Sequence, residues 1–184
     1  MDRGSSSYLR FLNGDDSGME EIITEYKDGL IFYLNSLVGD LWLAEELAED
    51  TFVLLCTKKP KDKQKSSFKT WLYTIGRNVA ISNFRRSVKN RTESIETCND
   101  IADSSEDIYR SYLREERKIK LHRALEKLKP EYRQILWLIY FEGFNHKDIA
   151  SVMNKTAHST EMLATRARRA LRSELEKEGF IYED

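Results

Sequence analysis

Apolar side chains recur at steps of three and four residues between residues 19 and 56, the spacing expected of helices that bury one face. The short sequence Val38-Gly39-Asp40 interrupts the pattern and predicts that one helix ends there and a second begins. The apolar positions of the two helices are Ile22, Ile23, Tyr26, Leu30, Tyr33, Leu34 and Leu37, then Leu43, Leu47, Thr51 and Leu54.

The next segment, residues 58–67, is predicted to be a loop because it is almost entirely polar and because Pro60 breaks a helix. Ser66 or Ser67 is suited to cap the helix that follows. That helix is expected to end near Arg85 and Arg86. Its apolar positions are Phe68, Trp71, Leu72, Ile75, Val79 and Phe84.

Residues 92–113 have a different composition, with many acids and few large apolar side chains, which is typical of a flexible linker. Helical periodicity returns from residue 114, first over Ile119 to Leu128. Pro130 suits the first turn of the next helix, and Gly143 is a candidate for its C-cap. A short helix at 147–153, a turn at 154–156 and a long helix from Ala157 to about Lys177 complete the prediction.

No segment alternates polar and apolar residues for long, so no strand is expected. Only two prolines and eight glycines occur, which favours long helices over hairpins. The sequence therefore predicts an all-α protein with two small helical domains, residues 1–91 and 114–184, joined by the acidic linker at 92–113.

Charge is distributed unevenly, although the net charge is only −1. Between Asp15 and Asp50 there are eleven acids and one base, whereas between Lys58 and Arg91 there are eleven bases and one acid. This asymmetry suggests one surface for a basic partner and another for phosphates. The alternative is that the two segments neutralise each other within one helical domain.

Several classes of protein find no support in the sequence. Cys56 lies in an apolar run and Cys98 is distant from it, so neither a disulfide framework nor a metal site is expected. Three histidines without metal-ligand spacing, no glycine-rich phosphate loop and no nucleophile arrangement predict no catalysis, no cofactor and no small-molecule substrate. No stretch reaches transmembrane length or resembles a signal peptide, which predicts a cytoplasmic protein.

The two last predicted helices are joined by a tight turn, and the second carries Arg166, Arg168, Arg169 and Arg172, a pattern that indicates a helix-turn-helix. A single helix fits the major groove of B-DNA, where its first residues reach base edges while later arginines meet phosphates. The alternative is a plain helical bundle with a basic exposed face. The candidate DNA-binding residues are His158, Ser159, Glu161, Met162, Thr165, Arg166 and Arg169.

Ordered motifs along the chain resemble those of the sigma-70 family, above all its compact extracytoplasmic-function (ECF) group. The first half contributes Leu12-Asn-Gly-Asp15, Gly39-Asp-Leu-Trp-Leu-Ala-Glu-Glu-Leu-Ala-Glu-Asp-Thr-Phe52, Phe68-Lys-Thr-Trp-Leu-Tyr-Thr-Ile-Gly-Arg-Asn-Val-Ala80 and Asn83-Phe-Arg-Arg86. The second half contributes Ala124-Leu-x-x-Leu-x-Pro-x-x-Arg-x-Ile135, Gly143-Phe144, Asp148-Ile-Ala150 and Arg166-Ala-Arg-Arg-Ala-Leu171. Each piece is short, and their order is what carries the resemblance.

The resemblance implies a transcription initiation factor that binds core RNA polymerase and recognises promoter DNA at the −10 and −35 elements. It implies an acidic helix that grips polymerase, with contacts from Glu46, Leu47, Glu49, Asp50, Phe52 and Val53. It implies a basic region that holds the melted −10 strand, with contacts from Lys63, Ser66, Ser67, Lys69, Arg77, Asn78 and Arg85. Phe68 and Trp71 are placed where bases could stack, but their helical spacing favours core packing.

The resemblance also implies that residues 141–172 read the −35 element and that an anti-sigma factor holds the protein inactive. This chain departs from the family pattern at His158, Glu161, Leu163 and Ala164, so the family's base contacts are not carried over to this stretch. A stand-alone helix-turn-helix regulator is the alternative. A regulator should bind duplex DNA tightly without polymerase, whereas a sigma factor should bind specifically only with the core enzyme.

Overall fold

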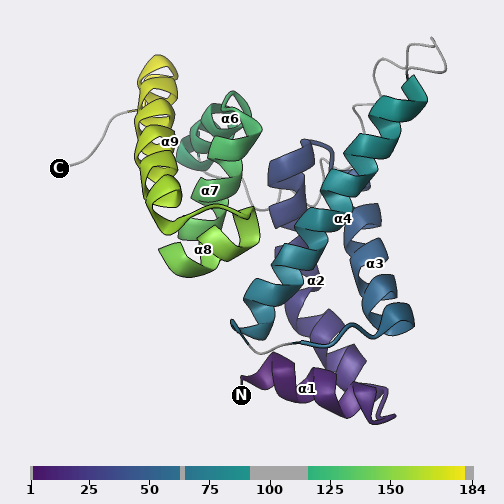
Figure 1. The fold of residues 1–184 in the computed structure, drawn as a ribbon. Helices are drawn as coiled ribbons and strands as arrows, with labels where there is room; N and C mark the ends of the chain where they lie inside the picture. Colours follow the sequence, from purple (N-terminus) through teal and green to yellow (C-terminus); the bar gives the residue numbers. More distant parts are fainter. Residues whose placement is uncertain (1, 63–64, 92–115, 181–184) are drawn as a thin grey trace.

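The computed structural model describes residues 2–62, 65–91 and 116–180, and within these ranges every regular element is a helix. The all-α prediction is therefore confirmed. The first group of helices is α1 (Arg3–Leu12), α2 (Ser17–Val38), α3 (Leu41–Lys58) and α4 (Phe68–Arg91). The second is α6 (Glu116–Glu126), α7 (Pro130–Tyr140), α8 (His146–Met153) and α9 (Ala157–Lys177) (Figure 1).

Local chemistry ends and begins the helices where the sequence predicts. Gly39 closes α2 in the left-handed conformation, with φ of 74°, and the Asp40 carboxylate accepts the Leu43 amide at 3.1 Å to open α3. Ser67 caps α4 by accepting the Thr70 amide at 3.2 Å. In the C-terminal group, Thr156 opens α9 by accepting the Ser159 amide at 3.1 Å.

Three boundaries differ from the prediction. Helix α1 was not expected, and the Asp2 carboxylate caps it by accepting the Ser5 amide at 2.8 Å. Helix α4 continues to Arg91 instead of ending near Arg86. Gly143 does adopt a left-handed conformation, but the C-cap of α7 is Phe141, so the glycine turns the chain two residues later.

Helix α2 is the centre of the first group, where α1, α3 and α4 pack around it (Figure 1). Leu30 and Leu34 of α2 are fully buried, together with Leu55 of α3 and Leu72 of α4. Removal of such side chains from water is the main force that holds the helices together. In the second group, α9 packs along α6, α7 and α8 over Ile135, Ile149 and Ala164 in particular.

The two groups also contact each other, because α7 packs on α2 and α8 packs on α4. Gln134 of α7 donates a buried hydrogen bond of 2.9 Å to the Tyr33 hydroxyl of α2. Arg133 donates from Nε to the Ser36 carbonyl in the last turn of α2, at 3.1 Å. These contacts place the C-terminal helices against α2 and α4, although the exact domain limits at 91 and 114 stay a prediction.

Candidate nucleic-acid and partner interfaces

Helix α9 presents the whole predicted set of duplex-binding residues on one side. Its buried stripe, formed by Thr160, Leu163, Ala164 and Ala167, faces the other helices of the C-terminal group. With 3.6 residues per turn, the predicted residues lie on the opposite side of the helix. Each of them is exposed, namely His158, Ser159, Glu161, Met162, Thr165, Arg166 and Arg169.

The arginines of α9 differ in their availability. Arg168 donates from Nε to the Tyr140 hydroxyl at 3.0 Å, and Arg172 forms an ion pair with Glu176 at 3.1 Å. Arg166 and Arg169 are exposed and form no ion pair with any described residue. Their guanidinium groups are therefore free to meet DNA phosphates. Helix α8 packs against α9 across the turn at Asn154, which adopts a left-handed conformation with φ of 51°.

Helix α3 carries an exposed acidic face. Glu46, Glu49, Asp50 and Val53 are exposed, and helical spacing places them on one side together with Trp42. The indole of Trp42 is 65% exposed and Val53 is 57% exposed, which makes them the apolar part of this face. Trp42 is not among the contacts predicted from the sequence, although it lies one helical turn before Glu46.

Two predicted polymerase contacts need correction. Leu47 and Phe52 point away from this face and are only 1% and 6% exposed. They belong to the core of the first group, so a partner that docks on α3 cannot reach them without rearrangement. The exposed apolar side chains of this face are those of Trp42 and Val53.

The residues predicted to hold single-stranded DNA lie in two different surroundings. Asn78, Arg85 and Ser67 are exposed, whereas Ser66 is half-buried and Lys63 lies outside the described residues. Lys69 and Arg77 are also half-buried, and Lys69 Nζ lies 2.8 Å from the Glu142 carboxylate, between α7 and α8. Phe68 is fully buried and Trp71 packs on Tyr8 and Phe68, so the core-packing interpretation holds for both.

Lys69 and Tyr73 of α4 meet Glu142, which lies between α7 and α8; we call these three residues the clasp. The Glu142 carboxylate lies 2.8 Å from Lys69 Nζ and accepts the Tyr73 hydroxyl at 2.8 Å. Its side chain is only 8% exposed. Burial, together with the neighbouring carboxylate, raises the pKa of Tyr73, which keeps the hydroxyl protonated as the donor. Nothing in the local sequence around Glu142 signals this contact.

The acidic and basic segments are not joined by ion pairs in the part of the chain that the structure describes. Among the described residues, no ion pair joins an acid of 15–50 to a base of 58–91. Several acids of α2 and the turn before it pair with α1 instead: Glu25 with Arg3, and Asp15 and Glu21 with Arg10. The acidic face of α3 is therefore exposed without an ion pair to the described bases of 58–91, as the first interpretation of the charge pattern expects.

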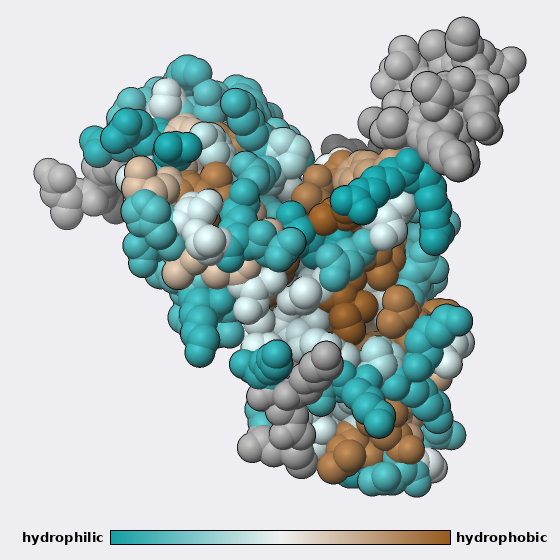
Figure 2. Space-filling model, in the orientation of Figure 1, coloured by the Kyte–Doolittle hydropathy of each residue, from teal (hydrophilic) through white to brown (hydrophobic). Residues whose placement is uncertain are grey.

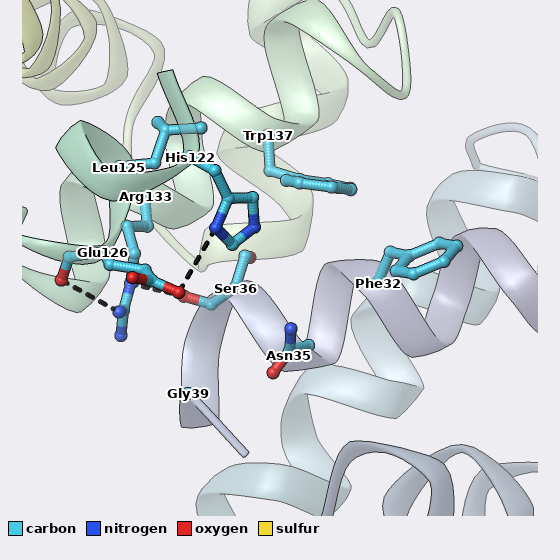
Figure 3. Close-up of a pocket in the computed structure, with 9 residues that line it drawn as sticks. All are labelled: Phe32, Asn35, Ser36, Gly39, His122, Leu125, Glu126, Arg133 and Trp137. Atoms are coloured by element: carbon cyan, nitrogen blue, oxygen red, sulfur yellow. Dashed lines mark hydrogen bonds and ion pairs between the residues drawn. The ribbon is translucent and has the colours of Figure 1, made fainter. Parts of the chain in front are cut away.

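A cavity of about 260 Å³ lies where α2 meets α6 and α7 (Figure 3). Arg133 and His122 project into it from the C-terminal helices, and Phe32 and Asn35 from α2. Burial lowers the pKa of His122, against the opposing effect of its partner Glu126. The described residues include no cluster of three His, Cys, Asp or Glu side chains suited to a metal ion, and no helix among them is apolar and long enough to cross a membrane.

The exposed apolar side chains are spread over both groups, as single residues more than as one continuous patch. Over the α1–α4 group, apolar surface appears between hydrophilic side chains on the face that Figure 2 shows. The large exposed side chains are Leu9, Trp42, Val53 and Phe84 in this group and Tyr140, Phe141 and Met162 in the other.

The chain is similar to known proteins along most of its length. The model of sigma-70 region 2 matches residues 22–90, and that of sigma-70 region 4 matches residues 118–171. The RNA polymerase sigma factor YlaC of Bacillus subtilis is 28% identical over 86% of this chain and 92% of its own. The ECF RNA polymerase sigma factor SigM of the same organism is 26% identical over 84% and 93%, and the RNA polymerase sigma-H factor of Pseudomonas aeruginosa 25% over 88% of each chain.

Solved structures show the same fold. The sigma factor RpoE of Bartonella quintana, in complex with the anti-sigma factor NepR, is similar with a TM-score of 0.62, 24% identity, and 85% of this chain and 96% of that one covered. CnrH, in complex with the cytosolic domain of CnrY, gives a TM-score of 0.66 at 18% identity over 96% and 99%. Two family regions in the expected order and relatives that match along most of their length agree with the motifs: the chain belongs to the sigma-70 family, in its extracytoplasmic-function group.

Proposed function

We propose that this protein binds core RNA polymerase and directs it to promoters, where it opens the −10 element and starts transcription. The observation that carries the proposal is the exposed face of α9, in which every predicted duplex-binding residue lies opposite the buried stripe. A helix that presents polar and basic side chains in this way can enter the major groove and anchor on phosphates.

Three surfaces, on α3, α4 and α9, bind polymerase, the melted strand and the duplex respectively. The acidic face of α3, with Glu46, Glu49, Asp50, Val53 and Trp42, grips a basic surface of polymerase. An exposed tryptophan at the edge of such a face is the kind of side chain that dominates binding energy.

The second and third surfaces bind DNA. The stripe of α4 that includes Lys69, Arg77, Asn78 and Arg85 holds the melted −10 strand through backbone and base contacts. The face of α9 defined above reads the −35 duplex. Glu161 departs from the family pattern; its exposed carboxylate is of the type that accepts a hydrogen bond from a cytosine amino group.

The protein carries out no covalent chemistry itself and needs no cofactor, since its role is to position polymerase on DNA in the cytoplasm. An anti-sigma factor is the expected regulator; support comes from the likeness to RpoE, which was crystallised with NepR. A stand-alone DNA-binding regulator would have no use for the exposed acidic face of α3.

The experiment is transcription in vitro with purified core polymerase and a promoter library. The proposal predicts initiation at a defined set of sites only when this protein is present. The matched control is the Asp50→Arg variant, which should stay folded because Asp50 is exposed, yet lose activity. No specific initiation by the wild-type protein at any promoter would refute the proposal.

A further inference from the structure

The connection between α3 and α4 is attached to helix α1, which packs along α2 and across the start of α4 (Figure 1). The structure describes two parts of this connection, residues 59–62 after α3 and residues 65–67 before α4, which we call the first arm and the second arm. Tyr8 of α1 is 2% exposed, and its hydroxyl donates to the Pro60 carbonyl of the first arm at 2.9 Å. Burial raises the pKa of Tyr8 to about 12, so the hydroxyl remains a donor at neutral pH.

Two further contacts join α1 to the first arm. Ser5 donates from its hydroxyl to the Asp62 carboxylate at 3.4 Å. Lys59 Nζ lies over the ring of Phe11, 4.8 Å from the ring centroid, where an ammonium is attracted to the face of the aromatic ring. Since Ser5, Tyr8 and Phe11 follow one another at intervals of three residues, they share one side of the helix. The first arm therefore lies along this side of α1.

Asp2 joins α1 to the beginning of α4. One carboxylate oxygen accepts the Ser5 amide at 2.8 Å, and the other accepts the Phe68 amide at 2.7 Å. Phe68 is the first residue of α4 and directly follows the second arm. Burial alone would raise the pKa of the Asp2 carboxyl, but the hydrogen bonds from Ser5 and Phe68 more than offset this effect and lower the pKa. A single ionised carboxylate thus caps two helices.

Two glycines allow α1 to lie close against its neighbours. A Cβ atom at Gly4 would lie 2.5 Å from Cδ1 of Phe68, and one at Gly18 of α2 would lie 2.2 Å from the Ser7 carbonyl oxygen. The second contact is to backbone, so a larger residue at Gly18 would push α1 away from α2. Movement of α1 would displace the first arm and the start of α4 together, because both are attached to it.

We propose that Asp2 and Tyr8 are positioning residues for promoter opening: they fix the two arms relative to α4, and so hold Ser66 and Ser67 in the arrangement that selects bases of the melted −10 strand. The inference rests on the proposed function, in which the start of α4 binds that strand, and on the predicted contacts of Ser66 and Ser67. Side chains select between ligands only when supporting residues hold them within about 0.5 Å of the productive geometry. Asp2 and Tyr8 supply this support through the backbone of the first arm and of α4, without touching DNA.

The first measurement is amide hydrogen exchange in the full-length free chain, followed by NMR. Asp2→Ala removes both acceptor oxygens, so the Phe68 amide should exchange about tenfold faster, the factor that corresponds to the loss of one hydrogen bond to a charged group. Asp40→Ala is the matched control, because it also removes a charged helix cap, yet the Asp40 carboxylate caps α3 through the Leu43 amide. Exchange at Phe68 that is unchanged in Asp2→Ala, or equally faster in Asp40→Ala, overturns the anchoring role of Asp2.

The second measurement is transcription with core polymerase from a library of promoters whose −10 element is randomised. Asp2→Ala should reduce the ratio of initiation at favoured over disfavoured −10 sequences about fivefold, and Tyr8→Phe, which removes only a hydroxyl, about threefold. A residue that merely stabilised the fold would lower initiation at every promoter by the same factor and leave this ratio unchanged. The matched control is Tyr26→Phe, because Tyr26 also packs on Phe68, with 5.6 Å between ring centroids, but its hydroxyl interacts with Glu25 of its own helix. This control should keep the wild-type ratio.

The outcomes separate the claims. Unchanged sequence ratios in both Asp2→Ala and Tyr8→Phe overturn the positioning role. An equal loss of ratio in Tyr26→Phe and Tyr8→Phe also overturns it, since the effect would then come from general packing around Phe68. Failure of the proposed function would appear as absence of promoter-specific initiation by the wild type; it would remove the role in promoter opening and leave the exchange result for Phe68 intact.

Discussion

Two helices of this protein carry basic residues that we assign to DNA, and their surroundings are opposite. On α9, Arg166 and Arg169 are exposed and unpaired among the described residues, opposite a continuous buried stripe. On α4, Lys69 is bound to Glu142 and Arg77 is half-buried. Residue type therefore indicates which ligand a helix can bind, whereas packing decides whether its binding residues are accessible.

The largest expected effect comes from α9, because its basic side chains are already exposed. Arg166→Ala combined with Arg169→Ala should weaken the holoenzyme's affinity for promoter duplex roughly 100-fold and reduce the slope of log affinity against log salt by about two, because two phosphate contacts are lost. Fluorescence anisotropy at several salt concentrations measures both quantities. Lys177→Ala, at the far end of α9 and paired with Glu174, should change neither. Equal losses in the two variants would contradict the assignment.

A somewhat smaller effect is expected on α3, which is uncovered like α9 but serves a different partner. Asp50→Arg should weaken binding to core polymerase roughly 30-fold, because it reverses a charge at the centre of the acidic face. Trp42→Ala should have a similar effect through lost apolar contact. Co-purification and titration with core enzyme measure the affinity, and circular dichroism checks the fold. Glu20→Arg is the control, as an equal charge reversal on exposed α2 surface outside this face; a matching loss there would point to nonspecific charge effects.

Lys69→Ala should separate two roles of Lys69, its contact with Glu142 in the clasp and its proposed contact with the melted strand. In the free chain it should separate the two groups of helices, because the clasp loses its cation. In the complex with polymerase it should reduce promoter opening about tenfold, because a charged strand contact is missing. Permanganate reactivity of −10 thymines measures the opening. If the two groups of helices separate and promoter opening is unimpaired, Lys69 contributes to the clasp alone.

The smallest expected effect is that of Gly29→Ala. The added methyl group would crowd the Tyr73 hydroxyl, which should raise the population in which the two groups are separated about threefold. The gain in helix propensity, about 1 kcal/mol, offsets the strain, so the melting temperature should move by only a few degrees. Lys27→Ala, two residues earlier and exposed, should leave the domain separation unchanged. An unaltered separation in Gly29→Ala would show that Tyr73 can shift without loosening the clasp.

Much of the helical order could be predicted from sequence because helix ends have local causes. Gly39, Pro130 and Thr156 stand at helix boundaries that their own backbone or side-chain chemistry produces. The exposed face of α9 could be predicted for a similar reason, since its period follows from helix geometry. Helix α1 was missed because its signals, Asp2 as a cap and Tyr8 and Phe11 as anchors, are spread over a short segment rich in serine.

The remaining features depend on contacts between distant parts of the chain. Glu142 meets Lys69 and Tyr73 from 73 and 69 positions away, and Gln134 reaches Tyr33 from 101 positions away. No local pattern indicates such pairs. For the same reason Leu47 and Phe52 could be mistaken for surface contacts, because a helix with apolar residues on several sides shows which side is buried only when its neighbours are placed.

The most direct test compares the separation of the two groups before and after promoter binding. Spin labels at Lys27→Cys and Arg123→Cys should give a short distance in the free chain, since α7 packs on α2 and α8 on α4. In the complex with core polymerase and promoter DNA, the distance should increase, as α4 and α9 move onto two separate promoter elements. A promoter complex that is active in transcription and retains the free-chain distance would contradict the assignment of α4 and α9 to two separate promoter elements.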